Sequence, residues 1–122
     1  MDTIDEFARA LVQRLNREAS DWVGLVDRTS DGSITDPYFR AVSRLYHALD
    51  DDEKQTFLAL VQHANADGAA SAFAAIEGVS CMNGWDGDFR LTYDGADLTE
   101  GLLDSFIGAQ DDEACLGRHA SH

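Results

Sequence analysis

Apolar residues recur every three or four positions through the first two thirds of the chain, which is the spacing of one face of an α-helix. From Thr3 to about Val26, ten apolar residues follow this spacing and polar residues fill the other positions. The same pattern predicts further helices, each with one buried side, over Pro37–Leu49, from Asp50 to about Ala66, over Ala69–Glu77, and from Asp97 to about Ala109.

The period of the pattern changes after the fourth predicted helix. Phe89, Leu91 and Tyr93 alternate with polar residues, as in a half-buried strand, so we expect Phe89 and Tyr93 to fill the core. The sequence Asp94-Gly95 is typical of a tight turn. Residues 79–82 form a second candidate strand.

These patterns predict a mainly α fold in a single domain over residues 1–109. We expect four to five helices with a small C-terminal β-hairpin or short strand pair. The 44% hydrophobic content is enough to build a core in a chain of 122 residues. No periodicity remains after Gln110, so residues 110–122 are expected to form a flexible tail.

Acidic residues mark several predicted helix boundaries. Asp50 with Glu53, and Asp97 with Glu100, have the spacing of a capping box, in which each side chain accepts a hydrogen bond from a free backbone amide. Asp67–Gly68 is expected to end the third helix. These acidic runs therefore point to helix termini more than to metal sites.

The connector after the first helix has a spacing similar to that of a calcium loop. Asp27, Thr29 and Asp31 stand at alternate positions, and a glycine follows where such a loop turns sharply. Tyr38, however, occupies the position that should hold a bidentate glutamate. Asp27, Thr29 and Asp31 are candidate metal ligands on this pattern.

A helix–helix connector explains the same segment better. Asp36 would cap the next helix, and Pro37 would be its first residue, a position where proline is favoured. Pro37 does not fit the calcium loop, so we favour the connector and keep cation binding over residues 27–38 as an alternative.

The net charge of −14 is distributed unevenly. Residues 1–54 carry 12 acidic and 7 basic residues, whereas residues 55–122 carry 11 acidic and 2 basic residues. Such a field repels nucleic acid and anionic membranes, and it attracts basic proteins. The charge therefore favours a basic protein as partner and argues against nucleic acid and membrane partners.

Compartment and chemistry follow from what the sequence contains. The start of the chain lacks the basic and apolar regions of a secretory signal, and no apolar run approaches the length of a membrane span. Cys81 and Cys115 are interpreted as free thiols in a reducing cytoplasm. No nucleophile motif or phosphate-binding glycine loop is present, so we expect neither an enzyme nor a cofactor.

A candidate partner site lies in the C-terminal half. Trp85 stands between glycine and Asp86 in a predicted loop, and Asp88 and Asp94 follow closely. An exposed aromatic residue surrounded by acids is a suitable anchor for a basic partner. We therefore predict Trp85, Asp86, Asp88 and Asp94 as partner-binding residues.

The segments SITDPYFRAVSRLYHALDDDEKQTFLALV, AIEGV and DFRLTYDGADLTEGLLDSF cover about Ile34–Phe106. In this order they resemble a group of small acidic bacterial proteins, mostly uncharacterised, some of which look like immunity partners of secreted toxins. The resemblance implies a cytoplasmic protein that covers a basic toxin, and it carries no catalytic residue onto this chain.

The sequence thus predicts a non-enzymatic, acidic protein-binding module, with an immunity protein against a basic bacterial toxin as its most specific form. Calcium binding by residues 27–38 is one alternative. The other is a DNA-mimic inhibitor, in which carboxylates would repeat at phosphate-like spacing. Both a monomer and a homodimer are compatible with the pattern.

Overall fold

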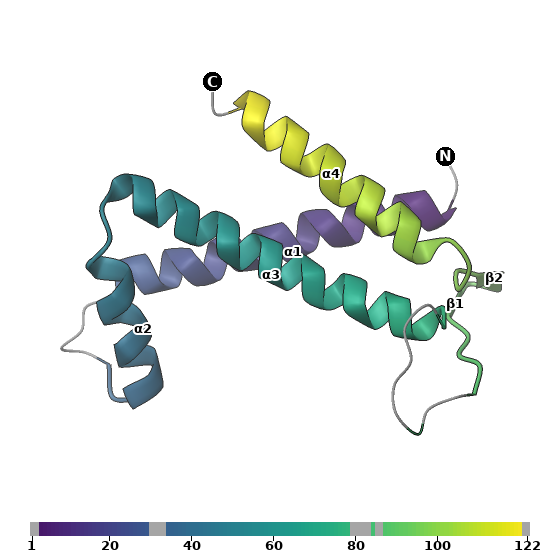
Figure 1. The fold of residues 1–122 in the computed structure, drawn as a ribbon, viewed down its shortest axis with the longest axis horizontal. Coiled ribbons are helices and arrows are strands. Elements are labelled where there is room, and N and C mark those ends of the chain that lie inside the picture. Colours follow the sequence, from purple (N-terminus) through teal and green to yellow (C-terminus); the bar gives the residue numbers. More distant parts are fainter. Residues whose placement is uncertain (1–2, 30–33, 79–83, 85–86, 121–122) are drawn as a thin grey trace. The chain divides into compact units, whose positions relative to one another are not determined.

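The computed structural model describes residues 3–29, 34–78, 84 and 87–120 (Figure 1). Within these residues the fold is mainly α, with four helices and one two-stranded antiparallel sheet, which confirms the predicted fold class. In chain order the elements are α1 (Thr3–Arg28), α2 (Pro37–His47), α3 (Asp51–Ile76), β1 (Thr92–Tyr93), β2 (Ala96–Asp97) and α4 (Leu102–Ala120). None of the helices in this part of the chain is long and apolar enough to cross a membrane.

The chain divides into two compact units. Unit 1 combines Met1–Arg14 with Ala66–His122, and unit 2 is the continuous segment Leu15–Asn65. Helices α1 and α3 each contribute residues to both units. The single domain over residues 1–109 and the flexible tail stay predictions, although α4 runs to Ala120, past the residue where the apolar pattern ends.

The core of unit 1 is formed by α4, the start of α1 and the second half of α3. Phe106 and Leu102 of α4 and Val12 of α1 are fully buried. The rings of Phe73 and Phe106 meet edge to face, with 5.2 Å between their centroids. Burying a side chain of this size stabilises the fold by about 1.5–3 kcal/mol, so Phe73 and Phe106 fasten α3 to α4.

The core of unit 2 centres on Val23, Val26 and Tyr46. The Tyr46 ring lies edge-on to Phe57, with 5.5 Å between centroids, and Lys54 Nζ lies 5.1 Å from the Tyr46 centroid. Partly buried apolar residues from all three helices of the unit, and from the connector between α2 and α3, complete this core: Trp22, Phe39, Val42, Leu49, Phe57, Leu58 and Val61.

Side chains of α2 satisfy carbonyl groups at the end of α1. His47 Nε2 lies 3.2 Å from the carbonyl oxygens of both Val26 and Thr29, and Ser43 Oγ is 3.5 Å from the Thr29 carbonyl oxygen. Carbonyls in the last turn of a helix have no partner within the helix. Side chains of α2 therefore supply hydrogen-bond partners to carbonyl groups at the end of α1.

Two predicted helix starts are confirmed. The Asp36 carboxylate accepts a hydrogen bond of 2.9 Å from the Tyr38 amide, and Pro37 is the first residue of α2. At α3, Glu53 accepts from the Asp50 amide at 2.9 Å, and Asp50 accepts from the Glu53 amide at 2.8 Å. The residues directly before α2 thus behave as the end of a helix–helix connector, with Asp36 as the cap of α2.

The predicted break at Asp67–Gly68 is wrong, because α3 continues through it to Ile76. A single glycine inside a helix costs only about 1 kcal/mol relative to alanine. The alanines on either side favour the helix, and its continuation brings Phe73 into the core against Phe106. Tertiary packing therefore outweighs the local preference for a break.

The hairpin is shorter than the predicted strand. β1 pairs with β2 in the register Thr92↔Asp97 and Tyr93↔Ala96, and the turn residues Asp94 and Gly95 have φ angles of 49° and 82°. Tyr93 is 66% exposed, so its predicted place in the core is wrong. A sheet of two-residue strands has no second layer against which Tyr93 could pack. The candidate strand at 79–82 lies outside the described residues.

The predicted capping box of Asp97 and Glu100 is also wrong. Asp97 belongs to β2, and its carboxylate accepts from the Thr99 amide at 2.8 Å. The first backbone hydrogen bond of α4 instead runs from the Ser105 amide to the Gly101 carbonyl, at 3.0 Å. Gly101 has a φ of 88°, a backbone conformation that glycine adopts readily. The chain changes direction at this residue, between the turn formed by Asp97 and Thr99 and the start of α4.

Candidate functional site

The predicted partner-binding residues fall in different places. Trp85 and Asp86 lie outside the described residues. Asp88 is exposed and lines a hollow of about 210 Å³ beside the end of α3, and Asp94 is exposed in the hairpin turn, away from that hollow. Asp94 is not among the residues that line this hollow, and the partner site itself stays a prediction.

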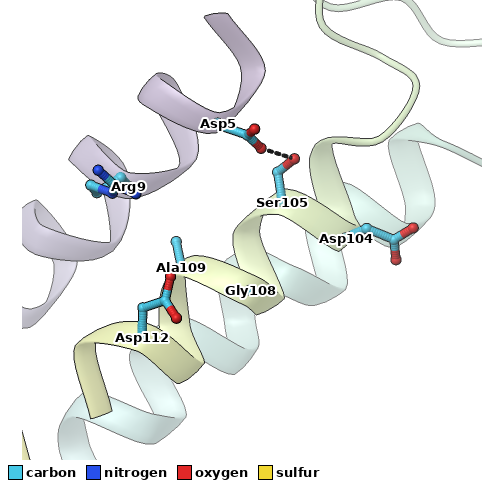
Figure 2. Close-up of a pocket in the computed structure, with 7 residues that line it drawn as sticks. All are labelled: Asp5, Arg9, Asp104, Ser105, Gly108, Ala109 and Asp112. Carbon is cyan, nitrogen blue, oxygen red and sulfur yellow. Dashed lines mark hydrogen bonds between the residues drawn. The ribbon is translucent and has the colours of Figure 1, made fainter. Parts of the chain in front are cut away.

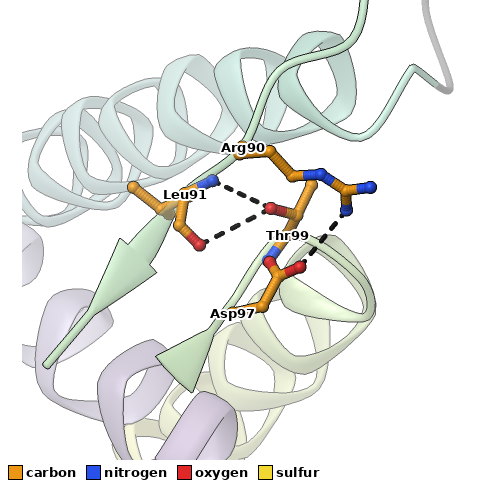
Figure 3. Close-up of polar contacts among 4 residues, drawn as sticks. All are labelled: Arg90, Leu91, Asp97 and Thr99. Carbon is orange, nitrogen blue, oxygen red and sulfur yellow. Dashed lines mark hydrogen bonds and ion pairs between the residues drawn. The ribbon is translucent and has the colours of Figure 1, made fainter. Parts of the chain in front are cut away.

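Figure 3 shows how polar contacts hold the hairpin. Arg90 Nη1 forms an ion pair of 3.2 Å with Asp97 Oδ2, and the Leu91 amide donates to Thr99 Oγ1 at 2.8 Å. Hydrogen bonds from the Thr99 side chain and amide, together with the charge of Arg90, lower the pKa of Asp97. Asp97 thus has a structural role, and the hairpin presents Tyr93 and Asp94 to solvent.

Two of the candidate calcium ligands take part in local structure. Asp27 lies in the last turn of α1, and the pKa of Tyr46 is raised by burial first and then by the charge and hydrogen bond of Asp27. The Thr29 hydroxyl donates to the Leu25 carbonyl at 2.6 Å. Asp31 lies outside the described residues. Among the residues the structure describes, no group of three or more His, Cys, Asp or Glu side chains could hold a metal ion.

Unit 1 has an acidic groove between α1 and α4 (Figure 2). Two adjoining hollows of about 450 Å³ and 470 Å³ share Arg9, Ala109 and Asp112. We call this the α1–α4 groove and define it by its lining residues: Asp5, Arg9, Gln13, Asp104, Ser105, Gly108, Ala109, Asp112 and Glu113.

Hydrogen bonds across the groove join the two helices. Ser105 Oγ donates to Asp5 Oδ1 at 2.7 Å, and Gln13 Nε2 donates to Glu113 Oε1 at 3.2 Å. Each bond links residues exactly one hundred positions apart in sequence. The walls of the groove are therefore fixed by contacts between opposite ends of the described chain.

Negative charge dominates the lining. Asp5, Asp104, Asp112 and Glu113 line the two hollows together with one basic residue, Arg9. Figure 2 draws no hydrogen bond between Arg9 and Asp5, Asp104 or Asp112, and Asp5 accepts one from Ser105 instead. Between the acids lie Gly108, which has no side chain, and Ala109, which has only a methyl group. A Cβ added at Gly108 would meet nothing within 4 Å.

The sequence patterns do not reveal this groove, because its residues form no motif. Asp5 belongs to the first helix, and the other three carboxylates lie about a hundred residues later among ordinary helix positions. The sequence property that could have indicated the groove is the uneven distribution of charge between the two units. Unit 1 carries 14 acidic and 4 basic residues, a net charge of −10, whereas unit 2 carries 9 acidic and 5 basic residues, a net charge of −4.

An open groove with this lining is suited to binding cations. Exposed carboxylates raise the local concentration of positively charged groups and increase their rate of association. A lysine or arginine side chain of a partner can approach several carboxylates there at once. In comparisons with protein-family models, curated protein sequences and solved structures, no match to this chain was found.

Proposed function

We propose that this chain is a non-enzymatic, acidic binding module of the cytoplasm whose partner is a basic protein. The observation that carries the proposal is the α1–α4 groove, whose lining contains four carboxylates and one arginine. Its most specific form is an immunity protein that neutralises a basic bacterial toxin by covering it.

The charge of unit 1 supports this proposal. A surface with a net charge of −10 steers a basic protein towards it over distances of about the Debye length, ~8 Å at physiological salt. Complementary charge of this kind raises the rate of association more than it raises the affinity.

The predicted site around the hairpin is a second contact area of the same unit. Trp85, Asp86 and Asp88 stay the predicted anchor, and exposed Tyr93 beside Asp94 adds an aromatic residue that the sequence pattern assigned to the core. Tyrosine and tryptophan are the side chains that most often carry binding energy at interfaces.

The test begins with a partner captured on the purified chain and identified, whose affinity is then measured by calorimetry over a series of salt concentrations. We expect the partner to be basic and its affinity to fall steeply with salt. The groove variant Asp104→Asn, Asp112→Asn, Glu113→Gln should weaken binding by at least tenfold, about 1.4 kcal/mol.

A matched control neutralises three exposed acids of unit 2, by Asp21→Asn, Asp51→Asn and Asp52→Asn. It changes the net charge by the same amount as the groove variant, so it should keep most of the affinity. If both variants lose the same affinity, net charge alone accounts for the loss. That result would overturn the role of the groove in binding. A third variant, Trp85→Ala with Asp86→Asn and Asp88→Asn, tests the predicted anchor separately.

Two further measurements separate the forms of the proposal. If the partner is a toxin, co-expression of this chain should protect cells from it, and a toxin gene is expected next to the gene for this chain. If the chain mimics DNA, duplex DNA should compete with it for the partner. Competition without protection would replace toxin neutralisation by the DNA-mimic alternative.

A further inference from the structure

Helix α2 has apolar residues on more than one side. Ser43 and Tyr46 face the core of unit 2 and are buried. On another side, Tyr38 and Leu45 are 71% and 60% exposed, and Ala41 between them is exposed as well. Residues spaced three and then four positions apart form one stripe along a helix, which is the spacing of the contact seam between paired helices. We call Tyr38, Ala41 and Leu45 the α2 stripe.

The charge of α2 differs from that of the other described helices. It contains Arg40 and Arg44 and no acidic residue, whereas α1, α3 and α4 each contain more acidic than basic residues. Two copies of a chain with a net charge of −14 repel each other wherever acidic surfaces meet. Helix α2 is therefore the helix through which two copies can meet with the fewest acidic residues in contact.

We infer that the α2 stripe packs antiparallel against the α2 stripe of a second copy of this chain. Asp36, an exposed acid, caps the N-terminal end of α2, and Arg44, an exposed base, lies near its C-terminal end. In an antiparallel pair, Arg44 of each copy approaches Asp36 of the other, and the two helix dipoles run in opposite directions. A parallel pair would instead place Arg44 beside Arg44.

This charge arrangement selects the occupant. One surface supplies both the acid and the base of the contact, as a symmetric dimer interface requires. The inference goes beyond the proposed function, because every residue that carries it belongs to unit 2 and none lines the α1–α4 groove.

The register of the pair follows from the spacing of the stripe. If Tyr38 of each copy lies against Leu45 of the other, the two-fold axis passes midway between Ala41 and Val42. The small side chain of Ala41 then lies near the axis, where it lets the helix axes approach to about 8–10 Å. The half-buried Val42 adds apolar surface at the same point.

The dimer is expected to be weak. The stripe extends for only about 10 Å along α2, from Tyr38 to Leu45. Such a contact is smaller than the roughly 1,600 Å² that a stable interface buries, so we expect a dissociation constant on the order of 0.1 mM.

Sedimentation equilibrium of the full chain, from tenfold below to tenfold above this value, tests the inference. The average mass should rise with concentration towards that of two chains. Leu45→Glu should raise the dissociation constant by at least about tenfold, because it places a charge in the apolar seam. The matched control is Leu60→Glu in α3, a leucine with 61% exposure, which should leave the constant nearly unchanged.

Charge variants test the antiparallel direction. Asp36→Asn removes the charge and keeps the helix cap, since asparagine caps as well as aspartate, so the melting temperature should hardly change while the dimer weakens several-fold. Arg44→Glu should weaken it further, because an acid then meets Asp36 of the other copy. The double variant should lose less than the product of the two single effects, because the two acids no longer meet. Within one copy these residues are about 12 Å apart along the helix.

A chain that stays monomeric at every concentration would overturn the inference, as would equal effects of Leu45→Glu and Leu60→Glu. Independent effects of Asp36→Asn and Arg44→Glu would overturn the antiparallel pairing. The proposed function is judged separately, by the captured partner and the groove variant. Loss of self-association therefore leaves the basic partner of unit 1 untouched, and failure of that partner leaves the α2 dimer untouched.

Discussion

Glu77 caps the last helix from outside it: one oxygen of its carboxylate accepts a hydrogen bond of 3.2 Å from the backbone amide of Leu103. Glu77 directly follows α3, and Leu103 is the second residue of α4. The first amides of a helix have no partner within it, and negative charge is favoured at this end of the helix dipole. The start of α4 is therefore stabilised by a residue 26 positions earlier.

Replacing Glu77 by alanine should lower the free energy of unfolding by about 1 kcal/mol, because the Leu103 amide loses its acceptor. Glu77→Gln keeps an acceptor and loses the charge, so its cost should be smaller. Urea unfolding of both variants measures the difference. Glu100→Ala is the control, and a loss as large as that of Glu77→Ala would contradict the capping role.

Alanine substitutions at two glycines should change stability in opposite directions. Gly101 has a φ of 88°, which alanine adopts only with strain, so Gly101→Ala should cost about 1 kcal/mol or more. Gly68 lies inside α3 with open space around it, so Gly68→Ala should stabilise the protein by about 0.5–1 kcal/mol. Thermal unfolding of both variants measures this. A loss of stability in Gly68→Ala would contradict a continuous α3.

The stability of the hairpin should depend on acidic pH through Asp97. Folding lowers the pKa of Asp97, chiefly through its hydrogen bonds from Thr99. The ionised form is thus favoured in the folded state, and its contribution is complete above the ordinary pKa of 3.8 and lost as the pH falls through the lowered value.

Asp97→Asn removes this titration. At neutral pH the variant should be less stable than the natural sequence, and the gap should close on going to strongly acidic pH. Denaturant unfolding of both proteins across this range measures the gap. A gap that stays constant would show that ionised Asp97 contributes nothing to folding.

Alkaline pH should act on unit 2 through Tyr46. Burial, followed by the charge and hydrogen bond of Asp27, raises the pKa of Tyr46 above its ordinary value of 10.0. The neutral phenol is favoured in the folded state, so its contribution is complete below the ordinary pKa and lost as the pH rises through the raised value.

Tyr46→Phe cannot ionise at this position. The stability of the natural sequence relative to Tyr46→Phe should therefore fall as the solution becomes strongly alkaline, as measured by unfolding at a series of pH values. Asp27→Asn should weaken the effect, because one of its causes is removed. A parallel pH dependence of the natural and Tyr46→Phe proteins would contradict this account.

Local signals in the sequence predicted local structure well. The capping box of Asp50 and Glu53 and the cap of Asp36 before Pro37 involve residues at most three positions apart, and both are present. The break at Gly68 was predicted from the same kind of signal and is wrong. The free-energy cost of one glycine in a helix is smaller than the free energy gained by burying Phe73. That burial depends on α4 and cannot be predicted from the residues around Gly68.

The missed features depend on residues that are distant in sequence. Asp97 and Glu100 have capping-box spacing, but other groups accept the first amide hydrogen bonds of α4. These acceptors are the Gly101 carbonyl and the side chain of Glu77, which is remote in sequence. Alternation placed Tyr93 on a strand face and could not tell whether another layer covers it. The α1–α4 groove likewise needs Asp5 beside Ser105, which only the packing of α1 on α4 provides.

Unit 1 is assembled from two segments that are distant in sequence, so it can form only after both have been synthesised. The segment Leu15–Asn65 is continuous, so all the residues that form the contacts within unit 2 are available once this segment has left the ribosome. The start of α1 must wait until the ribosome has made α4, so Val12 stays without its core partners in the nascent chain. The groove is therefore completed only after α4 has been synthesised, and a partner that needs both of its walls can bind only after that step.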